Sequence, residues 1–310
     1  MSAPIGVLVM AYGGPNSLDE VEPYLLDVRG HRPTPAHVVA EVKSRYAAIG
    51  GRSPILEQTT AQARALEAAL GGNGHFKAVV GMRHWQPRIA AGLASLADAR
   101  IERVVGLVMA PHYSALSIEL YFQQVEASRG ALAIAPVREW HLLPGFLVAL
   151  EDRIAEALDR FPESQRDTVP LLFTAHSLPQ RILASGDPYP AQLAATVQAV
   201  LPRLGNQGHG RVHRFAYQSA GRTADPWLGP DAGTVIEELA ALGHRTVLLV
   251  PIGFTCEHVE VLYDIDLELR RRANGLEMHL ERIVMVNDHP AMIDGLADLV
   301  RRTATGSGWM

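Results

Sequence analysis

The sequence has a single cysteine, Cys256, in 310 residues, which excludes an internal disulfide and any site that needs four cysteines, such as an iron–sulfur cluster. Charged residues make up only 20% and the net charge is −5, which argues against a nucleic-acid-binding protein. No apolar run approaches the roughly 20 residues that a membrane span needs. The first apolar run has no basic segment before it and ends in a glycine turn, which predicts a strand and not a signal peptide. We therefore expect a cytoplasmic protein without a transmembrane segment.

Apolar residues are plentiful, at 48%, and their spacing alternates between strand and helix patterns along the whole chain. The expected strands are 5–11, 76–82, 103–110, 132–139, 169–175, 212–218, 246–252 and 279–286. The expected helices are about 17–28, 36–48, 57–70, 86–99, 116–128, 147–161, 189–204, 231–242, 257–269 and 290–302. This order predicts an α/β protein with two Rossmann-like, doubly wound parallel-sheet domains. We expect the domains to cover residues 1–143 and 144–310, with the last helix, about 289–303, able to pack back on the first domain.

Polar and aromatic side chains follow several of the expected strands. They are Tyr12; Arg83 and His84; His112 and Tyr113; His176 and Ser177; and Gln218 and Ser219. In open parallel sheets, ligands bind beyond the carboxyl ends of the strands. Two domains whose strand ends face each other would therefore enclose one polar cleft.

The segment 251–268 contributes a further strand end and then a stripe of acids. Glu260, Asp264 and Glu268 recur every four residues, so their carboxylates share one face of the expected helix. Like charges at this spacing repel, and no lysine or arginine precedes Arg270 in the segment. We expect a cation from outside the helix, or protons in transit, to neutralise the stripe. The alternative is an ordinary solvated face.

His176 ends a buried strand, where a histidine is more often a hydrogen-bonded structural residue than a functional one. A neutral imidazole can bind a divalent metal or take a proton near neutral pH. The fingerprints of nucleotide binding, G-x-x-x-x-G-K-[ST] and G-x-G-x-x-G, are absent, and so is the G-x-S-x-G elbow of hydrolases. A hydrolase that uses Ser177 with His176 is disfavoured, because adjacent residues of a strand point to opposite sides.

A group of motifs resembles the ferrochelatases, the enzymes that insert ferrous iron into a porphyrin. They are AYGGP, RYAAIGGRSPI, APHYSALS, TAHSLP, GDPYPAQL, QSAGRTADPWLGPD and GFTCEHVEVLYDID, spread from residue 5 to about 270. The resemblance implies paired Rossmann-like domains with the porphyrin between them. It also implies that His176 is the catalytic pocket histidine and that Glu260 faces it across the macrocycle. Either residue could bind the iron or accept a porphyrin proton, and the sequence does not decide between them.

The metal-binding residues that we expect are His176, Glu260, Asp264 and Glu268, with Fe²⁺ as substrate and Mg²⁺ as a candidate at the acidic stripe. We expect no permanently bound cofactor. Many ferrochelatases hold an iron–sulfur cluster, which one cysteine cannot support. A helix beginning near Cys256 would lower its thiol pKa, although a small buried filler is the simpler interpretation.

The porphyrin is anionic because it carries propionates, and residues 29–52 have a local excess of basic residues. We expect Arg29, Arg32, Arg45 and Arg52 to contribute to a propionate clamp, since arginine suits carboxylates. Arg45 could instead face solvent from the middle of its helix. Ser53 and Trp227 complete the expected substrate-binding residues.

Tyr12 should face the cleft, and a tyrosine there resembles the ferrochelatases that use coproporphyrin III to give coproheme. The alternatives are a protoporphyrin IX ferrochelatase, a chelatase that inserts cobalt or nickel into a different tetrapyrrole, and an inactive porphyrin- or haem-binding chaperone. The expected partners are a porphyrin and Fe²⁺, with transient contacts to other haem-pathway enzymes allowed.

Overall fold

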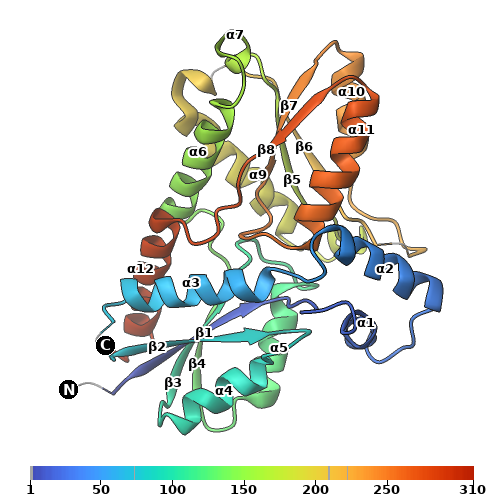
Figure 1. The fold of residues 1–310 in the computed structure, drawn as a ribbon. Coiled ribbons are helices and arrows are strands. Elements are labelled where there is room, and N and C mark those ends of the chain that lie inside the picture. Colours follow the sequence, from blue (N-terminus) through green and yellow to red (C-terminus); the bar gives the residue numbers. More distant parts are fainter. Residues whose placement is uncertain (1–2, 73, 209, 222) are drawn as a thin grey trace.

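Two parallel β-sheets with helices on both faces form the computed structural model, which describes residues 3–72, 74–208, 210–221 and 223–310 (Figure 1). The first sheet has the order β2-β1-β3-β4 and the second the order β6-β5-β7-β8. The strands are β1 (Ile5–Ala11), β2 (Phe76–Met82), β3 (Arg103–Val108), β4 (Ala133–Val137), β5 (Leu171–His176), β6 (His213–Gln218), β7 (Thr246–Pro251) and β8 (His279–Arg282). The predicted α/β class and parallel sheets are confirmed.

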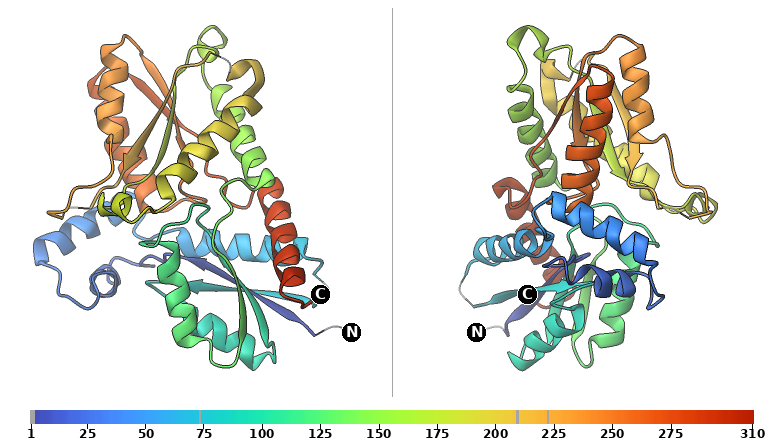
Figure 2. Two further views of the ribbon diagram at one scale, coloured as in Figure 1. Left: turned by 180° about the vertical axis from the view of Figure 1, so that it is seen from behind. Right: turned by 45° about the vertical axis from the view of Figure 1, so that its right-hand side comes forward.

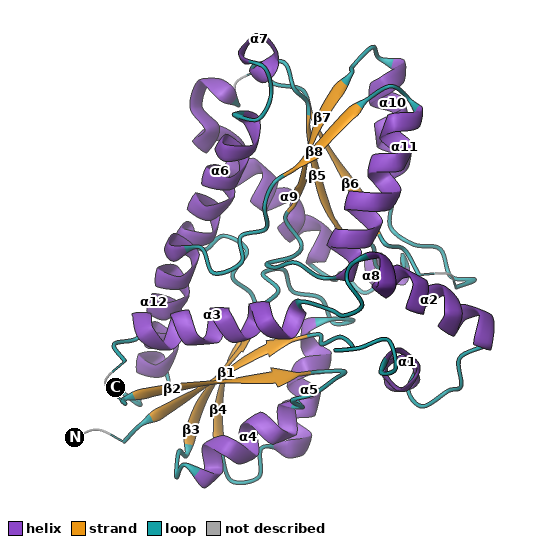
Figure 3. Cartoon of the chain, in the orientation of Figure 1, coloured by secondary structure: helices purple, strands orange, loops and turns teal. Residues whose placement is uncertain are grey.

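Helices connect consecutive strands, as parallel pairing requires (Figure 3). The first half has α1 (Val21–Val28), α2 (Ala36–Ala48), α3 (Ile55–Ala69), α4 (Ile89–Asp98) and α5 (Ile118–Ser128). The second half has α6 (Pro144–Leu158), α7 (Glu163–Arg166), α8 (Arg181–Ala184), α9 (Tyr189–Val200), the 3₁₀ helix η1 (Leu201–Gln207), α10 (Ala232–Ala241), the π-helix η2 (Glu260–Leu269), α11 (Arg270–Gly275) and α12 (Pro290–Gly306). No helix in the described ranges is long and apolar enough to cross a membrane.

Alternate residues of each strand enter different hydrophobic clusters, because successive side chains point to opposite faces. Val7 and Val9 of β1 pack toward α3 and α12, whereas Leu8 and Met10 pack toward α4 and α5. All seven residues of β1 are buried, as expected for an inner strand covered on both faces.

One hydrophobic cluster runs through both halves of the molecule. It contains residues of β1 and β3 from the first sheet, residues of β5 and β7 from the second, and residues of α6, α9 and α12. The helices α12 and α6 pack at a point where both have glycine: a Cβ on Gly145 would lie 2.0 Å from the Ala291 carbonyl oxygen and 3.3 Å from the Gly295 Cα. Figure 2 shows α12 beside both α6 and α3, so this helix joins the two halves.

Each sheet has a topological switch point, where consecutive connections leave a strand in opposite directions: between β1 and β3 in the first sheet and between β5 and β7 in the second. The chain leaves β1 for β2 on one side and later returns to β3 on the other, and β5 lies between β6 and β7 in the same way. The carboxyl ends of β1, β3, β5 and β7 therefore bound the space between the sheets. This is where ligands bind in doubly wound folds.

Candidate active site

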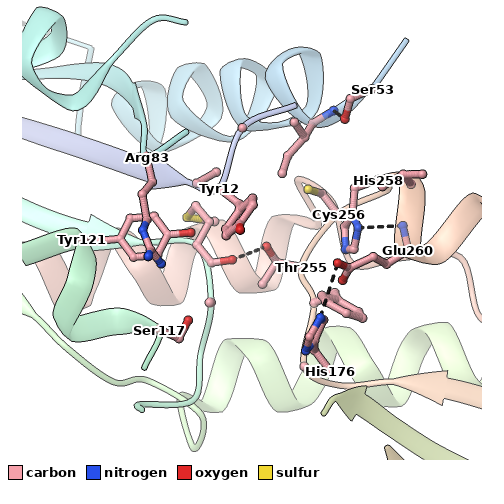
Figure 4. Close-up of a pocket in the computed structure, with 18 of the residues that line it drawn as sticks. Tyr12, Ser53, Arg83, Ser117, Tyr121, His176, Thr255, Cys256, His258 and Glu260 are labelled. Carbon is pink, nitrogen blue, oxygen red and sulfur yellow. Dashed lines mark hydrogen bonds and ion pairs between the residues drawn. The ribbon is translucent and has the colours of Figure 1, made fainter. Parts of the chain in front are cut away.

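A pocket of about 320 Å³ lies between the two sheets at these strand ends. The first half contributes polar and aromatic side chains, among them Tyr12, Tyr24, Tyr46, Ser53, Arg83, His112, Ser117 and Tyr121. The second half contributes His176, Leu178, Tyr189 and the run from Gly253 to Glu260, apart from Glu257. Figure 4 shows Arg83, Tyr121 and Ser117 on one side of the pocket and His176 with Glu260 on the other.

His176 and Glu260 form an ion pair in the pocket wall. The Nε2 atom of His176 lies 3.5 Å from Oε1 of Glu260, and both side chains keep about a third of their surface exposed, at 30% and 33%. Burial alone would lower the pKa of His176, but the charge and hydrogen bond of Glu260 raise it to about 8. Burial acts to raise the pKa of Glu260, and His176 overcomes that effect and lowers it. The pair therefore rests as imidazolium and carboxylate at neutral pH.

The 3.5 Å contact corrects the expectation that Glu260 faces His176 across the macrocycle. A ring inserted between two groups needs roughly 3.5 Å of van der Waals distance on each of its faces. The two side chains consequently belong to one side of the pocket, and the side chain on the facing wall is Tyr12 (Figure 4).

The backbone holds His176 in one orientation. Its Nδ1 contacts the Ser177 carbonyl oxygen, and the Tyr189 hydroxyl donates a hydrogen bond of 2.9 Å to the carbonyl of His176. When His176 is neutral, this arrangement keeps the proton on Nδ1 and leaves the Nε2 lone pair directed at the pocket. Ser177 is completely buried and donates to Leu228, so it is not available as a nucleophile.

A second histidine, His258, lies beside Glu260. The Glu260 backbone N–H donates to Nδ1 of His258 over 3.2 Å, and burial lowers the pKa of this ring to about 4. His258 is therefore a neutral neighbour of the charged pair. The sequence showed His258 next to the acidic stripe, but nothing in the spacing distinguished a pocket side chain from a core one.

The acidic stripe runs along the π-helix η2, where an α-helix was expected from about 257 to 269. Hydrogen bonds in a π-helix join residues five apart, and such turns are rare and often occur at functional sites. The three carboxylates still follow one side of the helix. Glu260 reaches the pocket, whereas Asp264 and Glu268 lie progressively farther from it and contact α2.

Arg45 of α2 is the cation that meets this stripe. Its guanidinium lies 3.4 Å from Asp264 and 3.9 Å from Glu268, and it also pairs with Glu41 at 3.0 Å. A cation from outside the helix was expected to neutralise the stripe, and Arg45 supplies that charge from a residue 219 positions away in the chain. Among the described residues, no three histidine, cysteine, aspartate or glutamate side chains are grouped as metal ligands.

Asp264 has an unusual environment. Burial raises its pKa to about 6 and outweighs the lowering effects of the hydrogen bond from Ser219 and of the charge of Arg45, while the charges of Glu260 and Glu268 add smaller increases. Ser219, the donor to this carboxylate, has a φ of 57°, in the left-handed region that costs energy for a residue other than glycine. Asp264 can therefore exchange a proton near neutral pH.

The other residues expected to bind substrate fall into two groups. Tyr12 and Ser53 line the pocket. Arg29 and Arg32 are exposed and lie outside its lining, and Arg52 pairs with Glu57 at 3.3 Å on the surface. Trp227 is also outside the lining, with its ring centroid 6.3 Å from that of His176. Their role in a propionate clamp stays a prediction.

The idea that a helix start lowers the thiol pKa of Cys256 is wrong. Cys256 is 5% exposed, and burial followed by the charge of Glu257 raises its pKa to about 12. The helix η2 begins only at Glu260, so its N-terminus is too far away to stabilise a thiolate. The side chain packs in a small cluster with Ala11, Ile55 and Met82.

Three comparisons place the chain among known proteins. The family model for ferrochelatase matches residues 4–304. A protein of Herpetosiphon aurantiacus named Ferrochelatase is 43% identical over 307 residues, which cover 97% of this chain and 99% of the relative. A Geobacillus kaustophilus protein named Coproporphyrin III ferrochelatase is 35% identical and covers 95% of this chain and 94% of its own length. Among solved structures, SirB from Bacillus subtilis with Fe³⁺ has the same fold, with a TM-score of 0.56, 14% identity, and coverage of 98% of this chain and 97% of that one.

The buried His112 generates a prediction about pH. Burial, and then the neighbouring His141, lower its pKa from 6.5 to about 3, while the unfolded chain takes up a proton below 6.5. The unfolded state then binds more protons, so the free energy of unfolding should fall as the pH drops from 6.5 to 5, by about 2 kcal/mol for this group. Urea unfolding at pH 7, 6 and 5 should show that the free energy of unfolding falls less with decreasing pH in His112→Gln than in the unmodified protein.

The exposed His37 provides the matched control for this experiment. His37→Gln should lose stability with falling pH as steeply as the unmodified protein. A His112→Gln variant with the unmodified slope would show that His112 is not held neutral in the folded protein.

Proposed function

The chain belongs to the ferrochelatase family, and we propose that it inserts Fe²⁺ into coproporphyrin III to give coproheme. The observation that carries this proposal is the His176–Glu260 pair, which faces Tyr12 across a pocket at the switch points of both sheets. Anaerobic incubation with Fe²⁺ and coproporphyrin III, followed by the porphyrin absorption spectrum, tests it. A spectrum that stays that of the free porphyrin would contradict the activity.

Metallation requires that iron lose its water ligands and that the porphyrin lose two N–H protons. In this proposal His176 and Glu260 approach the ring from one side, and each can act once the ion pair between them opens. Once the imidazolium has lost its Nε2 proton to solvent, the Nε2 atom of His176 offers a lone pair for the iron or for a pyrrole proton. The Glu260 carboxylate supplies the complementary oxygen ligand or proton acceptor.

The acidic stripe offers carboxylates that could accept the released protons or bind the incoming cation. Asp264 is electrostatically linked to Glu260 and has a pKa of about 6, so it can take up and release protons under physiological conditions. We propose that the series Glu260, Asp264 and Glu268 handles cations or protons between the pocket and the surface. Arg45 tunes that path because it shares its charge between Asp264 and Glu268.

The preference for coproporphyrin III is supported by Tyr12 and by the relatives that carry that substrate in their names. Burial raises the pKa of the Tyr12 phenol to about 12, despite the opposing charge of Arg83, so the hydroxyl stays protonated. A protonated phenol on the wall opposite His176 can approach the ring face as a neutral donor.

Substrate choice is the first prediction of this proposal. We expect kcat/KM for coproporphyrin III to exceed that for protoporphyrin IX by at least about tenfold, which is about 1.4 kcal/mol of differential transition-state stabilisation. Parallel anaerobic kinetics on the two porphyrins decide it. Equal or better use of protoporphyrin IX would assign the chain to the production of protohaem instead.

The catalytic pair gives the second prediction. His176→Ala should abolish iron insertion while porphyrin binding persists, because the variant loses a ligand or base and keeps the remaining pocket lining. Glu260→Gln keeps the shape and removes the charge, and should lower kcat by more than about tenfold. His213→Ala, at the far end of β6 from the pocket, is the control. Near-normal iron insertion by His176→Ala would refute the assignment.

The stripe gives the third prediction. Asp264→Asn with Glu268→Gln should slow turnover at low Fe²⁺ more than at saturating Fe²⁺, because the lost carboxylates attract and pass on the cation. The matched control removes two exposed acids at the same spacing on α12, Asp294 and Asp298. An iron dependence that matches the control would make the stripe a structural partner of Arg45 only.

A further inference from the structure

Arg83 presents a guanidinium to the pocket that the catalytic proposal does not use. It follows the last residue of β2, and its backbone N–H donates 2.9 Å to Ala11 at the end of β1. Its guanidinium carbon lies 5.7 Å from the Tyr12 ring centroid and 5.5 Å from that of Tyr121. The side chain is thereby fixed between two aromatic rings in the pocket wall (Figure 4).

This guanidinium has no carboxylate partner among the residues that the structure describes. Its Nε is buried without a hydrogen-bond partner in that part of the chain. The nearby acid, Asp27, is already bonded to His84 at 2.8 Å and to Arg88 at 2.6 Å. Arg45, in contrast, is surrounded by three carboxylates.

Removing a guanidinium from water without pairing it with an anion costs desolvation free energy. Cation–π contacts with aromatic rings recover only part of that free energy. Buried polar atoms without partners are few in native proteins, and each calls for an explanation. Here the open side of the guanidinium faces the substrate pocket. A ligand carboxylate is the group that would complete it, since arginine and carboxylate match in charge and geometry.

We propose that Arg83 binds a carboxylate of the tetrapyrrole substrate. The site also offers neutral donors: burial keeps the pKa of the Tyr121 phenol raised, so its hydroxyl stays protonated, and the Ser117 hydroxyl lies in the same wall. This inference rests on the proposed function, because it takes the pocket to be the porphyrin site.

The position of Arg83 makes it selective for the number of carboxylates. Ser53, which directly follows the segment where a propionate clamp is expected, and Arg83 lie on different sides of Tyr12 (Figure 4). The two propionates of protoporphyrin IX or mesoporphyrin IX occupy neighbouring pyrroles and so share one edge of the ring. A second anion site on another edge can be filled only by a porphyrin with propionates on further pyrroles, such as coproporphyrin III, which has one on each of its four pyrroles.

The test measures binding without iron. Fluorescence titrations of the full chain with coproporphyrin III and with mesoporphyrin IX compare the unmodified protein with Arg83→Met, which keeps an apolar stem between the rings and loses the charge. We expect Kd for coproporphyrin III to rise by about tenfold or more and Kd for mesoporphyrin IX to rise by less than about threefold. Arg83→Lys, with charge but no planar fork, should fall between Arg83→Met and the unmodified protein.

Arg138→Met is the matched control, because Arg138 also lies over an aromatic ring, 4.6 Å from the Phe122 centroid, but outside the pocket lining. It should leave both Kd values unchanged. Where Arg83→Met does not fold, Arg83→Gln makes the same comparison.

Two results would overturn the role of Arg83: an unchanged Kd for coproporphyrin III, or equal weakening of both porphyrins. Either result is compatible with iron insertion by the unmodified protein, so it would leave the proposed function intact. Failure of the unmodified protein to bind either porphyrin would instead reject both proposals.

Discussion

The two sheets share one hydrophobic core, and the position of the pocket depends on it. Residues of β1 and β3 pack in the same cluster as residues of β5 and β7, and α12 and α6 meet at glycines that let their backbones touch. Protein interiors are close-packed, so a shared core resists movement of one sheet relative to the other. The switch points of the two sheets are therefore held facing each other, with Thr255 bonded to the Met109 carbonyl across the junction at 2.8 Å.

This arrangement gives the pocket two chemically different walls. The wall from the second half carries the His176–Glu260 pair, with the neutral His258 behind it and the acids of η2 leading away. The wall from the first half carries protonated phenols and Arg83. In the proposed function, a flat anionic ring between these walls would meet ligands and bases on one face and donors on the other. Iron, as a cation, would be drawn to the acidic side, so the polarity of the pocket would distinguish the two faces of the ring.

Much of the fold could be predicted because it depends on local pattern. The bounds of β1, β2 and α2 agree with the spacing of apolar residues along the chain, and the eight strands appear in the expected order. The π-helix could not be predicted, because its five-residue hydrogen bonds leave the same four-residue acidic spacing in the sequence. Likewise, the position of Glu260 on the same side of the pocket as His176 depends on a contact between β5 and η2 that no local pattern encodes.

The arginines show the limit of an argument from composition. Composition tells where basic residues occur in the sequence, but not which of them remain unpaired in the folded protein. Residues 29–52 have the excess of cations, yet Arg45 is engaged by three carboxylates and Arg52 by Glu57, which leaves neither guanidinium free of an acidic partner. Arg83 lies outside that segment and has no ion pair with a carboxylate in the described part of the chain, while Asp27 is engaged by His84 and Arg88. Electrostatic affinity for an anion depends on the charge that remains after internal pairing and on how far the site is withdrawn from water. By that measure Arg83, which lies against two tyrosine rings in the pocket, should attract a substrate carboxylate more strongly than the arginines on the surface.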